Sequence, residues 1–82
     1  MQLEIITPEK KIYSGDIKLV QVPGSKGSFE VLNNHAPIIS TLEHGVIKLI
    51  DLQDRIVYFD INGGVIEVNQ NKIIILAETV LF

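Results

Sequence analysis

The chain has 82 residues, no cysteine and a formal net charge of −3 at pH 7. A chain of this length forms one small domain, and the lack of cysteine excludes disulfides and thiolate metal sites. Seven basic against ten acidic residues provide no cationic tract for a nucleic-acid backbone. Hydrophobic residues make up 46% of the chain and charged residues only 21%, so part of the apolar surplus is expected to form a contact surface.

The first residues, MQLEIITPEKK, do not show the pattern of a signal peptide. They alternate apolar and polar side chains and include Glu4, unlike the basic start and unbroken apolar middle of a signal peptide. No apolar run approaches the roughly 20 residues that a membrane-spanning helix needs. We therefore expect a soluble protein of the cytosol.

Short β-branched segments separated by turn residues predict an all-β fold, because no stretch keeps helical spacing for long. In chain order the expected strands are 3–7 (LEIIT), 11–14 (KIYS), 16–22 (DIKLVQV), 28–32 (SFEVL), 46–50 (VIKLI), 55–61 (RIVYFDI), 64–69 (GVIEVN) and 72–78 (KIIILAE). About eight strands at roughly ten-residue spacing are typical of a β-sandwich or a flattened barrel.

Alternation along these strands assigns one face of each to the core. The expected core members are Leu3, Ile5, Ile47, Leu49, Val57, Phe59, Ile61, Ile66, Val68, Ile73, Ile75 and Ala77. The opposite faces also carry apolar residues, namely Val46, Ile50, Ile56, Tyr58, Ile74 and Leu76. These outward residues indicate either a contact patch or strands that are covered on both sides, and the sequence leaves both open.

Two local patterns predict irregular backbone. The apolar alternation slips between Leu19 and Val20, which predicts a β-bulge at this point. Asn62 and Gly63 are typical of a type I′ hairpin turn, in which both residues take positive φ. Gly64 follows at once, and the glycine pair fits equally well a strand that crosses between two sheets or one that admits another backbone closely.

Motifs that carry chemistry are absent from the sequence. Segment 23–32, PGSKGSFEVL, is glycine-rich, but its lysine precedes the last glycine and a strand follows, so it predicts a loop rather than a phosphate site. His35, Glu43 and His44 show no spacing typical of zinc ligands. No serine has a histidine and an acid at a spacing that brings them together. We expect no metal, no cofactor and no catalytic residue.

Segment 33–37, NNHAP, is expected to form a shaped corner. Pro37 pushes Ala36 into extended geometry, and asparagines tolerate left-handed backbone and bond locally. The corner then projects His35, whose neutral ring can donate from one nitrogen and accept at the other. Such a ring suits a directional contact with another chain, and a bond to a carbonyl of its own fold is an equal alternative.

Five stretches of the sequence resemble a known family: LEIITPEKKIYSGDI, VPGSKGSFEVLNNHAPIIS, GVIKLI, INGGVIEV and NKIIILAE. They are similar to the epsilon subunit of F-type ATP synthases, called delta in mitochondria, and NHAP with the apolar pair after it is the most specific piece. The resemblance implies that residues 1–82 form the family's N-terminal domain, a flattened β-sandwich of about eight to ten short strands. Most relatives continue into a two-helix hairpin, which is expected to be absent because the chain stops at ETVLF.

The resemblance also implies a function. Members of this family are non-catalytic rotor subunits of the central stalk, and they link the gamma subunit to the membrane ring of c subunits. They couple proton flow to ATP synthesis without a reactive centre of their own, as part of the ATP synthase enzyme complex. For this chain the resemblance implies gamma and the c-ring as partners. It implies a peripheral position on the cytoplasmic face of the bacterial plasma membrane, within the complex.

Two sets of positions carry these implied contacts. The side facing gamma corresponds to Thr7, His35, Ile38, Ile39 and Ser40. The end facing the c-ring corresponds to Ser25, Lys26, Gly27 and Ser28. A polar loop suits a wet, charged contact, and a His-Pro corner beside two isoleucines suits a drier one.

The alternative prediction is a stand-alone β-sandwich that binds a small molecule or a sugar. Such a module needs an aromatic platform or an apolar pocket with converging polar groups. The chain has two tyrosines, three phenylalanines and no tryptophan, so little aromatic material is available for that platform.

Overall fold

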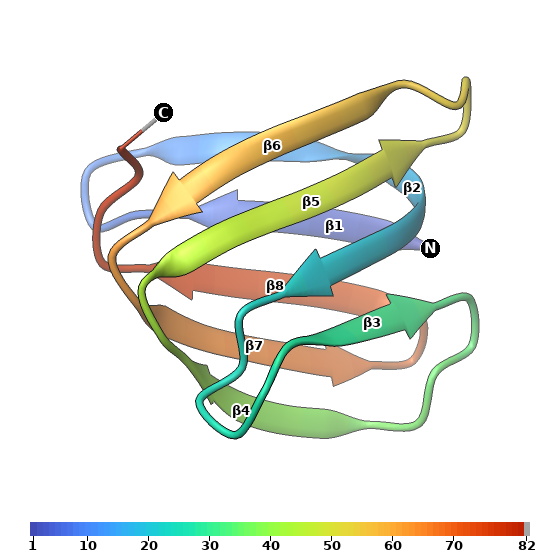
Figure 1. The fold of residues 1–82 in the computed structure, drawn as a ribbon. Helices are drawn as coiled ribbons and strands as arrows, with labels where there is room; N and C mark the ends of the chain where they lie inside the picture. The colour runs from blue at the N-terminus through green and yellow to red at the C-terminus, as the bar shows by residue number, and fades with distance from the viewer. Residues whose placement is uncertain (82) are drawn as a thin grey trace.

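The structure is a computed structural model that describes residues 1–81, and within them it contains strands and no helix (Figure 1). The strands are β1 (Gln2–Ile6), β2 (Lys11–Val22), β3 (Phe29–Leu32), β4 (Ile38–Leu42), β5 (Gly45–Asp51), β6 (Ile56–Ile61), β7 (Gly64–Asn69) and β8 (Lys72–Ala77). The predicted all-β class is confirmed.

Two layers of strands share the long strand β2. The layer at the rear of Figure 1, here the back layer, has the order β4-β7-β8-β1-β2. The front layer consists of β3, β2, β5 and β6, with β2 between β3 and β5. β1 and β8 pair in parallel, and the other strand pairs are antiparallel. β2 therefore bends from one layer into the other and closes one side of the sandwich.

The strand boundaries differ from the predicted ones at two places. Ser14 and Gly15 were expected to end a strand, but β2 runs through both and pairs them with β1. No strand is predicted from the sequence at 38–42, yet β4 lies there and forms the edge of the back layer beside β7. Two of the predicted strands form the single strand β2, and β4 is an additional strand. The number of strands in the described chain therefore equals the predicted number of about eight.

The core lies between the two layers and consists of apolar side chains. Most of its predicted members are buried, and Val57 and Phe59 are half-buried against them. Strands β2, β3 and β4 add Ile17, Val20, Val22, Val31 and Leu42. Both layers thus bury one face of alternating residues, as the period of two predicts.

The bulge in β2 lies earlier than predicted. Ile17 pairs with Asp51 and Leu19 pairs with Ile50, so Lys18 is the extra residue. The prediction of a bulge between Leu19 and Val20 is therefore wrong, because the extra residue that shifts the inward and outward positions is Lys18. The extra residue lets Ile17 and Val20 both face the core although their spacing is odd.

The connection from β6 to β7 carries the chain from the front layer to the back layer. φ is positive at Gly63, at 125°, but not at Asn62, so the predicted type I′ turn is wrong. Both alternatives for the glycine pair are confirmed. The chain changes layer here, and a Cβ built on Gly64 would lie 2.2 Å from the carbonyl oxygen of Leu76 on the neighbouring strand.

Candidate functional site

The titratable residues of the described chain are dispersed. Across residues 1–81, no three His, Cys, Asp or Glu side chains lie where they could share a metal ion. His35 and His44 lie in different loops, and Nε2 of His44 is 3.5 Å from the Asp60 carboxylate. Within the same residues, no helix has the length and apolar character needed to span a bilayer.

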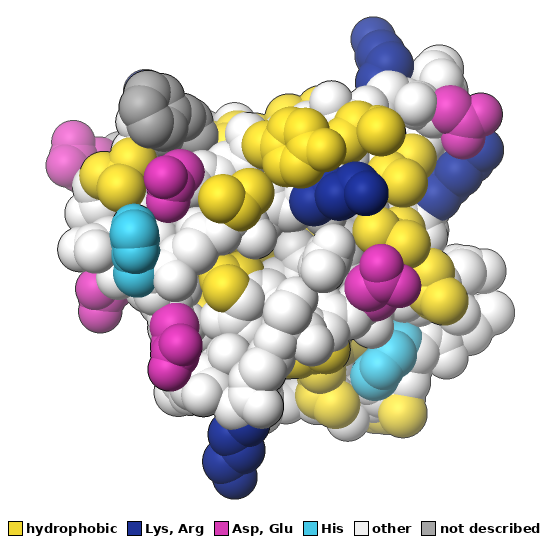
Figure 2. Space-filling view, viewed as in Figure 1, with side chains coloured by type: hydrophobic (Ala, Val, Ile, Leu, Met, Phe, Trp, Pro, Cys, Tyr) yellow, Lys and Arg dark blue, Asp and Glu magenta, His cyan; other side chains and the backbone are white. Residues whose placement is uncertain are grey.

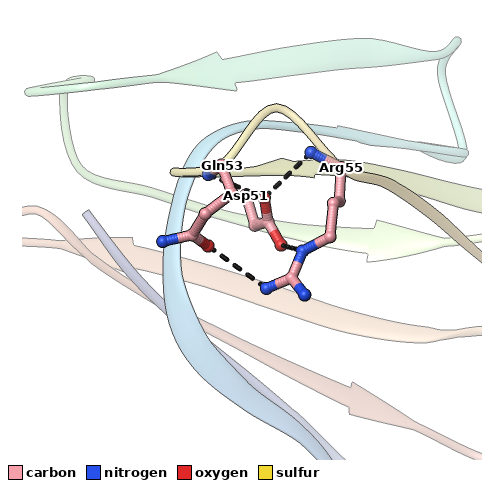
Figure 3. A network of polar contacts seen from close by, with 3 residues as sticks. All are labelled: Asp51, Gln53 and Arg55. Carbon is pink, nitrogen blue, oxygen red and sulfur yellow. Dashed lines mark hydrogen bonds and ion pairs between the residues drawn. The ribbon is translucent and has the colours of Figure 1, made fainter.

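The most connected polar cluster is a clamp on the turn between β5 and β6 (Figure 3). The Asp51 carboxylate accepts bonds of 2.9 Å from the backbone amides of Gln53 and Arg55, and one of 2.7 Å from the Arg55 guanidinium. Burial alone would raise the pKa of Asp51, but these three donors outweigh it and hold the pKa below its ordinary value. These bonds fix the turn between β5 and β6.

The lowered pKa of Asp51 predicts how acid affects the stability of the fold. Because its pKa is lowered on folding, its contribution to stability is complete above the unfolded pKa, near 4, and is lost as pH falls through the folded value. The free energy of unfolding of Asp51→Asn should therefore depend less on pH below about 4 than that of the wild type. Denaturant titrations at several acid pH values measure this. Asp16→Asn, at an exposed carboxylate, is the control, and an Asp51→Asn profile parallel to the wild type would contradict the prediction.

The outer face of the back layer is largely apolar and is grooved. Strand register places Ile39, Glu67, Ile74 and Glu4 in one row across it, and Thr41, Val65, Leu76 and Ile6 in the next. A shallow groove of about 390 Å³ is lined by Ile6, Ile39, Val65, Glu67, Ile74 and Leu76. Ile39 is 74% exposed and Leu76 52% exposed. We call this surface, with Thr7 at its edge, the back face.

The residues predicted to face gamma lie on or around the back face. Ile39 points outward from β4, and Thr7 lines a second groove, of about 650 Å³, beside the end of β1. Ile38 and Ser40 alternate to the inner side of β4, where both are half-buried and Ile38 packs on the core. His35 lies in the loop that leads into β4.

The loop that carries His35 is fixed by a residue that sequence reasoning missed. Asn71, in the turn between β7 and β8, accepts a 2.8 Å bond from the Asn34 amide and donates one of 2.8 Å to the Asn33 side chain. Asn34 has φ of 63°, which confirms the left-handed backbone. Nδ1 of His35 donates to the Ala36 carbonyl oxygen at 2.7 Å, so the ring does bond its own fold.

The residues predicted to face the c-ring form an exposed loop between β2 and β3. Gly27 has φ of 127°, and Ser25, Lys26 and Ser28 are exposed around it. The Ser25 amide donates to the Thr41 carbonyl oxygen at 3.0 Å, and the Thr41 hydroxyl donates to the Ser25 hydroxyl at 2.8 Å. These bonds tie the loop to β4 and hence to the edge of the back face.

A second apolar surface lies on the outer side of the front layer and faces the viewer in Figure 2. Register aligns Leu32, Leu19, Ile50 and Ile56 across β3, β2, β5 and β6. Val46, Tyr58 and the half-buried Lys48 adjoin this row, and Tyr58 is 59% exposed. We call this surface the front face. The outward apolar residues of both layers are thus accessible rather than covered by further strands.

Comparison with known proteins gives consistent matches. Residues 1–82 match the family described as ATP synthase, Delta/Epsilon chain, beta-sandwich domain. The chain is 45% identical over 83 residues to the ATP synthase epsilon chain of Campylobacter hominis, which covers 98% of this chain and 62% of the relative. It is 46% identical over 79 residues to that of Chlorobaculum tepidum, with 95% and 89% covered. The chain thus spans less than two thirds of the Campylobacter hominis protein.

Two solved structures share the fold. One chain of the Euglena gracilis mitochondrial ATP synthase, in a structure of OSCP, F1 and the c-ring, superposes with a TM-score of 0.91 at 17% identity, over 96% of this chain and 51% of that one. One chain of the Tetrahymena thermophila mitochondrial ATP synthase, from its central stalk and c-ring, gives 0.84 at 17% identity, over 99% and 65%. The predicted flattened β-sandwich is confirmed.

Proposed function

Because the chain belongs to the family of the ATP synthase delta/epsilon chain β-sandwich domain, we propose that it is a non-catalytic coupling piece of the central stalk of an F-type ATP synthase. The observation that carries this proposal is the family match over residues 1–82. These residues would correspond to the N-terminal sandwich domain of the longer relatives. The chain would lie at the membrane as part of the synthase, peripheral on the cytoplasmic face of a bacterial plasma membrane.

In this proposal gamma binds the back face. Ile39 and Leu76 expose most of their side chains there, and fully burying one such side chain stabilises a complex by roughly 1.5–3 kcal/mol. Thr7 at one end of the face and His35 beyond the other supply polar groups for the rim. Ile38 and Ser40, on the inner side of β4, would act by holding that strand in place.

The loop of Ser25, Lys26, Gly27 and Ser28 would meet the polar loops of the c-ring. Its bonds to Thr41 connect it to the strand that carries Ile39, so force at one contact passes to the other through backbone and side-chain hydrogen bonds. A rigid sandwich held in this way would turn with gamma and the ring. It would transmit torque without making or breaking a covalent bond.

The ring contact predicts a modest effect of single substitutions. Because an exposed charge pair contributes about 0.2–1 kcal/mol, Lys26→Gln should lower proton-driven ATP synthesis by at most roughly fivefold. ATP hydrolysis by the isolated catalytic sector should not change. Lys48→Gln, on the front face, is the control that removes the same charge elsewhere. Equal loss of synthesis in both variants would contradict the assignment of the loop.

A small-molecule module is disfavoured by the surface. The grooves of the back face are open and shallow, and no aromatic side chain lines any of the three. Tyr13 lines a groove of about 460 Å³ beside the Asp51 clamp, but no other aromatic side chain lines that groove. Phe59, whose ring centroid is 6.0 Å from that of Tyr13, packs against the core.

Association with gamma tests the proposal. The purified chain should bind purified gamma with a Kd in the micromolar range or below, measured by calorimetry or by co-elution. Absence of binding to both gamma and the assembled c-ring at micromolar concentrations would overturn it, as would turnover of a substrate by the chain alone.

A further inference from the structure

Glu67 lies in the middle of the apolar back face. Its neighbours in register are Ile39 on β4 and Ile74 on β8, and its side chain lines the groove between these strands. It also lines a third groove, of about 420 Å³, which extends to Pro37 beside the His35 loop. A carboxylate therefore occupies the part of the face that a covering partner would enclose most fully.

The charge of Glu67 is not neutralised within the described chain. Glu4, in the same row, accepts a 2.9 Å bond from Lys11, and this hydrogen bond, with the charge of Lys11, lowers the pKa of Glu4. Lys72 pairs in register with Asn69, one row away, and no ion pair joins it to Glu67 among residues 1–81. Of the two carboxylates in this row, one is paired internally and the other is not.

Covering Glu67 with apolar surface would be costly. A carboxylate removed from water without a partner loses hydration that apolar contacts do not replace. Truncating one member of a buried interfacial charge pair weakens binding for the same reason, because the other charge is left buried and unpaired. A partner that closes on Ile39 and Ile74 must therefore bring hydrogen-bond donors, and a positive charge, to the carboxylate between them.

We propose that the surface which covers the back face presents a lysine or arginine side chain to Glu67, and that this pair fixes the orientation of the partner on the sandwich. The inference depends on the proposed function, in which that partner is gamma. The apolar residues around Glu67 supply area, which is poorly directional. The carboxylate of Glu67 fixes the orientation of the partner, because the partner's cation must lie next to this carboxylate if neither charge is to be buried without a counter-charge.

Binding of gamma to charge variants tests this pair. Relative to the wild type, Glu67→Gln should weaken binding by about tenfold and Glu67→Lys by about 100-fold or more, as expected for an enclosed pair. Glu30→Lys makes the same charge change at an exposed position of β3 and should change Kd less than about threefold. Glu67 is itself exposed in the free chain, so its variants should keep the wild-type Tm.

Salt dependence and rescue separate a specific pair from general charge effects. The Kd of the wild type should rise with salt more steeply than that of Glu67→Gln. One charge reversal among the lysines and arginines of gamma should restore binding to Glu67→Lys.

Wild-type binding that Ile39→Asp weakens but Glu67→Lys does not would overturn this inference and leave the proposed function standing. A wild type that does not bind gamma would overturn both.

Discussion

Ile39→Asp is expected to weaken binding of gamma by roughly 100-fold or more. Ile39 is 74% exposed in the free chain and points outward from β4 into the groove of the back face. The substitution removes an apolar side chain worth about 2 kcal/mol when buried and places a second carboxylate beside Glu67, so the combined cost is about 3 kcal/mol or more. Titration calorimetry with purified gamma measures the change. His35→Ala should have a smaller effect, since the ring lies beyond the edge of the face.

Ile56→Asp is the matched control for this result. Ile56 also extends outward from a strand at the edge of its layer, and it is 52% exposed, but it belongs to the front face. Its substitution should leave the Kd for gamma near the wild-type value. If Ile56→Asp abolishes binding and Ile39→Asp does not, gamma binds the front face and the assignment of the two surfaces is wrong.

Gly64→Ala should destabilise the domain by about 3 kcal/mol or more, a large share of the stability of a small domain. A Cβ at this position would lie 2.2 Å from the Leu76 carbonyl oxygen and 3.0 Å from the Ala77 Cα. Both are backbone atoms of the paired strand, so no side-chain rotation relieves the contact. β7 and β8 must separate at this end, which weakens the layer that carries the back face.

Urea unfolding followed by circular dichroism measures this effect. Gly15→Ala is the control, because a Cβ there meets only the ring end of Tyr13, at 3.2 Å from its hydroxyl, and that side chain can shift. Its free energy of unfolding should lie within about 1 kcal/mol of the wild type. A Gly64→Ala midpoint equal to the wild-type midpoint would show that the strands do not need this close approach.

The core and the outward apolar residues were predictable because alternation is a local signal. The alternation within a single strand assigns residues such as Leu3, Ile5 and Ile73 to the core-facing side, and the structure buries all three. β4 was missed because only Leu42 is fully buried in it, and Ile39 and Thr41 on its outer side blur the alternation. β2 was divided in two because Gly15 resembles a turn residue although it pairs with Leu3 inside the ladder.

The arrangement of residues at the candidate site could not be predicted, because it depends on contacts between segments that are far apart in the sequence. Asn71 holds Asn33 and Asn34 from more than thirty residues away, and nothing in the turn between β7 and β8 indicates that role. Glu67 can be assigned to an outward face from GVIEVN alone. That Ile39 and Ile74 flank it follows only from the order and register of β4, β7 and β8. The roles in binding gamma and the c-ring come from the family resemblance, and the binding experiments test them.

In the proposed role, this domain works by being held through its back face and carries out no chemistry of its own. Backbone NMR of the labelled chain, with and without unlabelled gamma, tests this role residue by residue. The signals of Ile39, Glu67 and Leu76 should shift or broaden on binding, and those of Ile56 and Tyr58 should stay in place. Changes confined to the front-face residues, or none at saturating gamma, would contradict it.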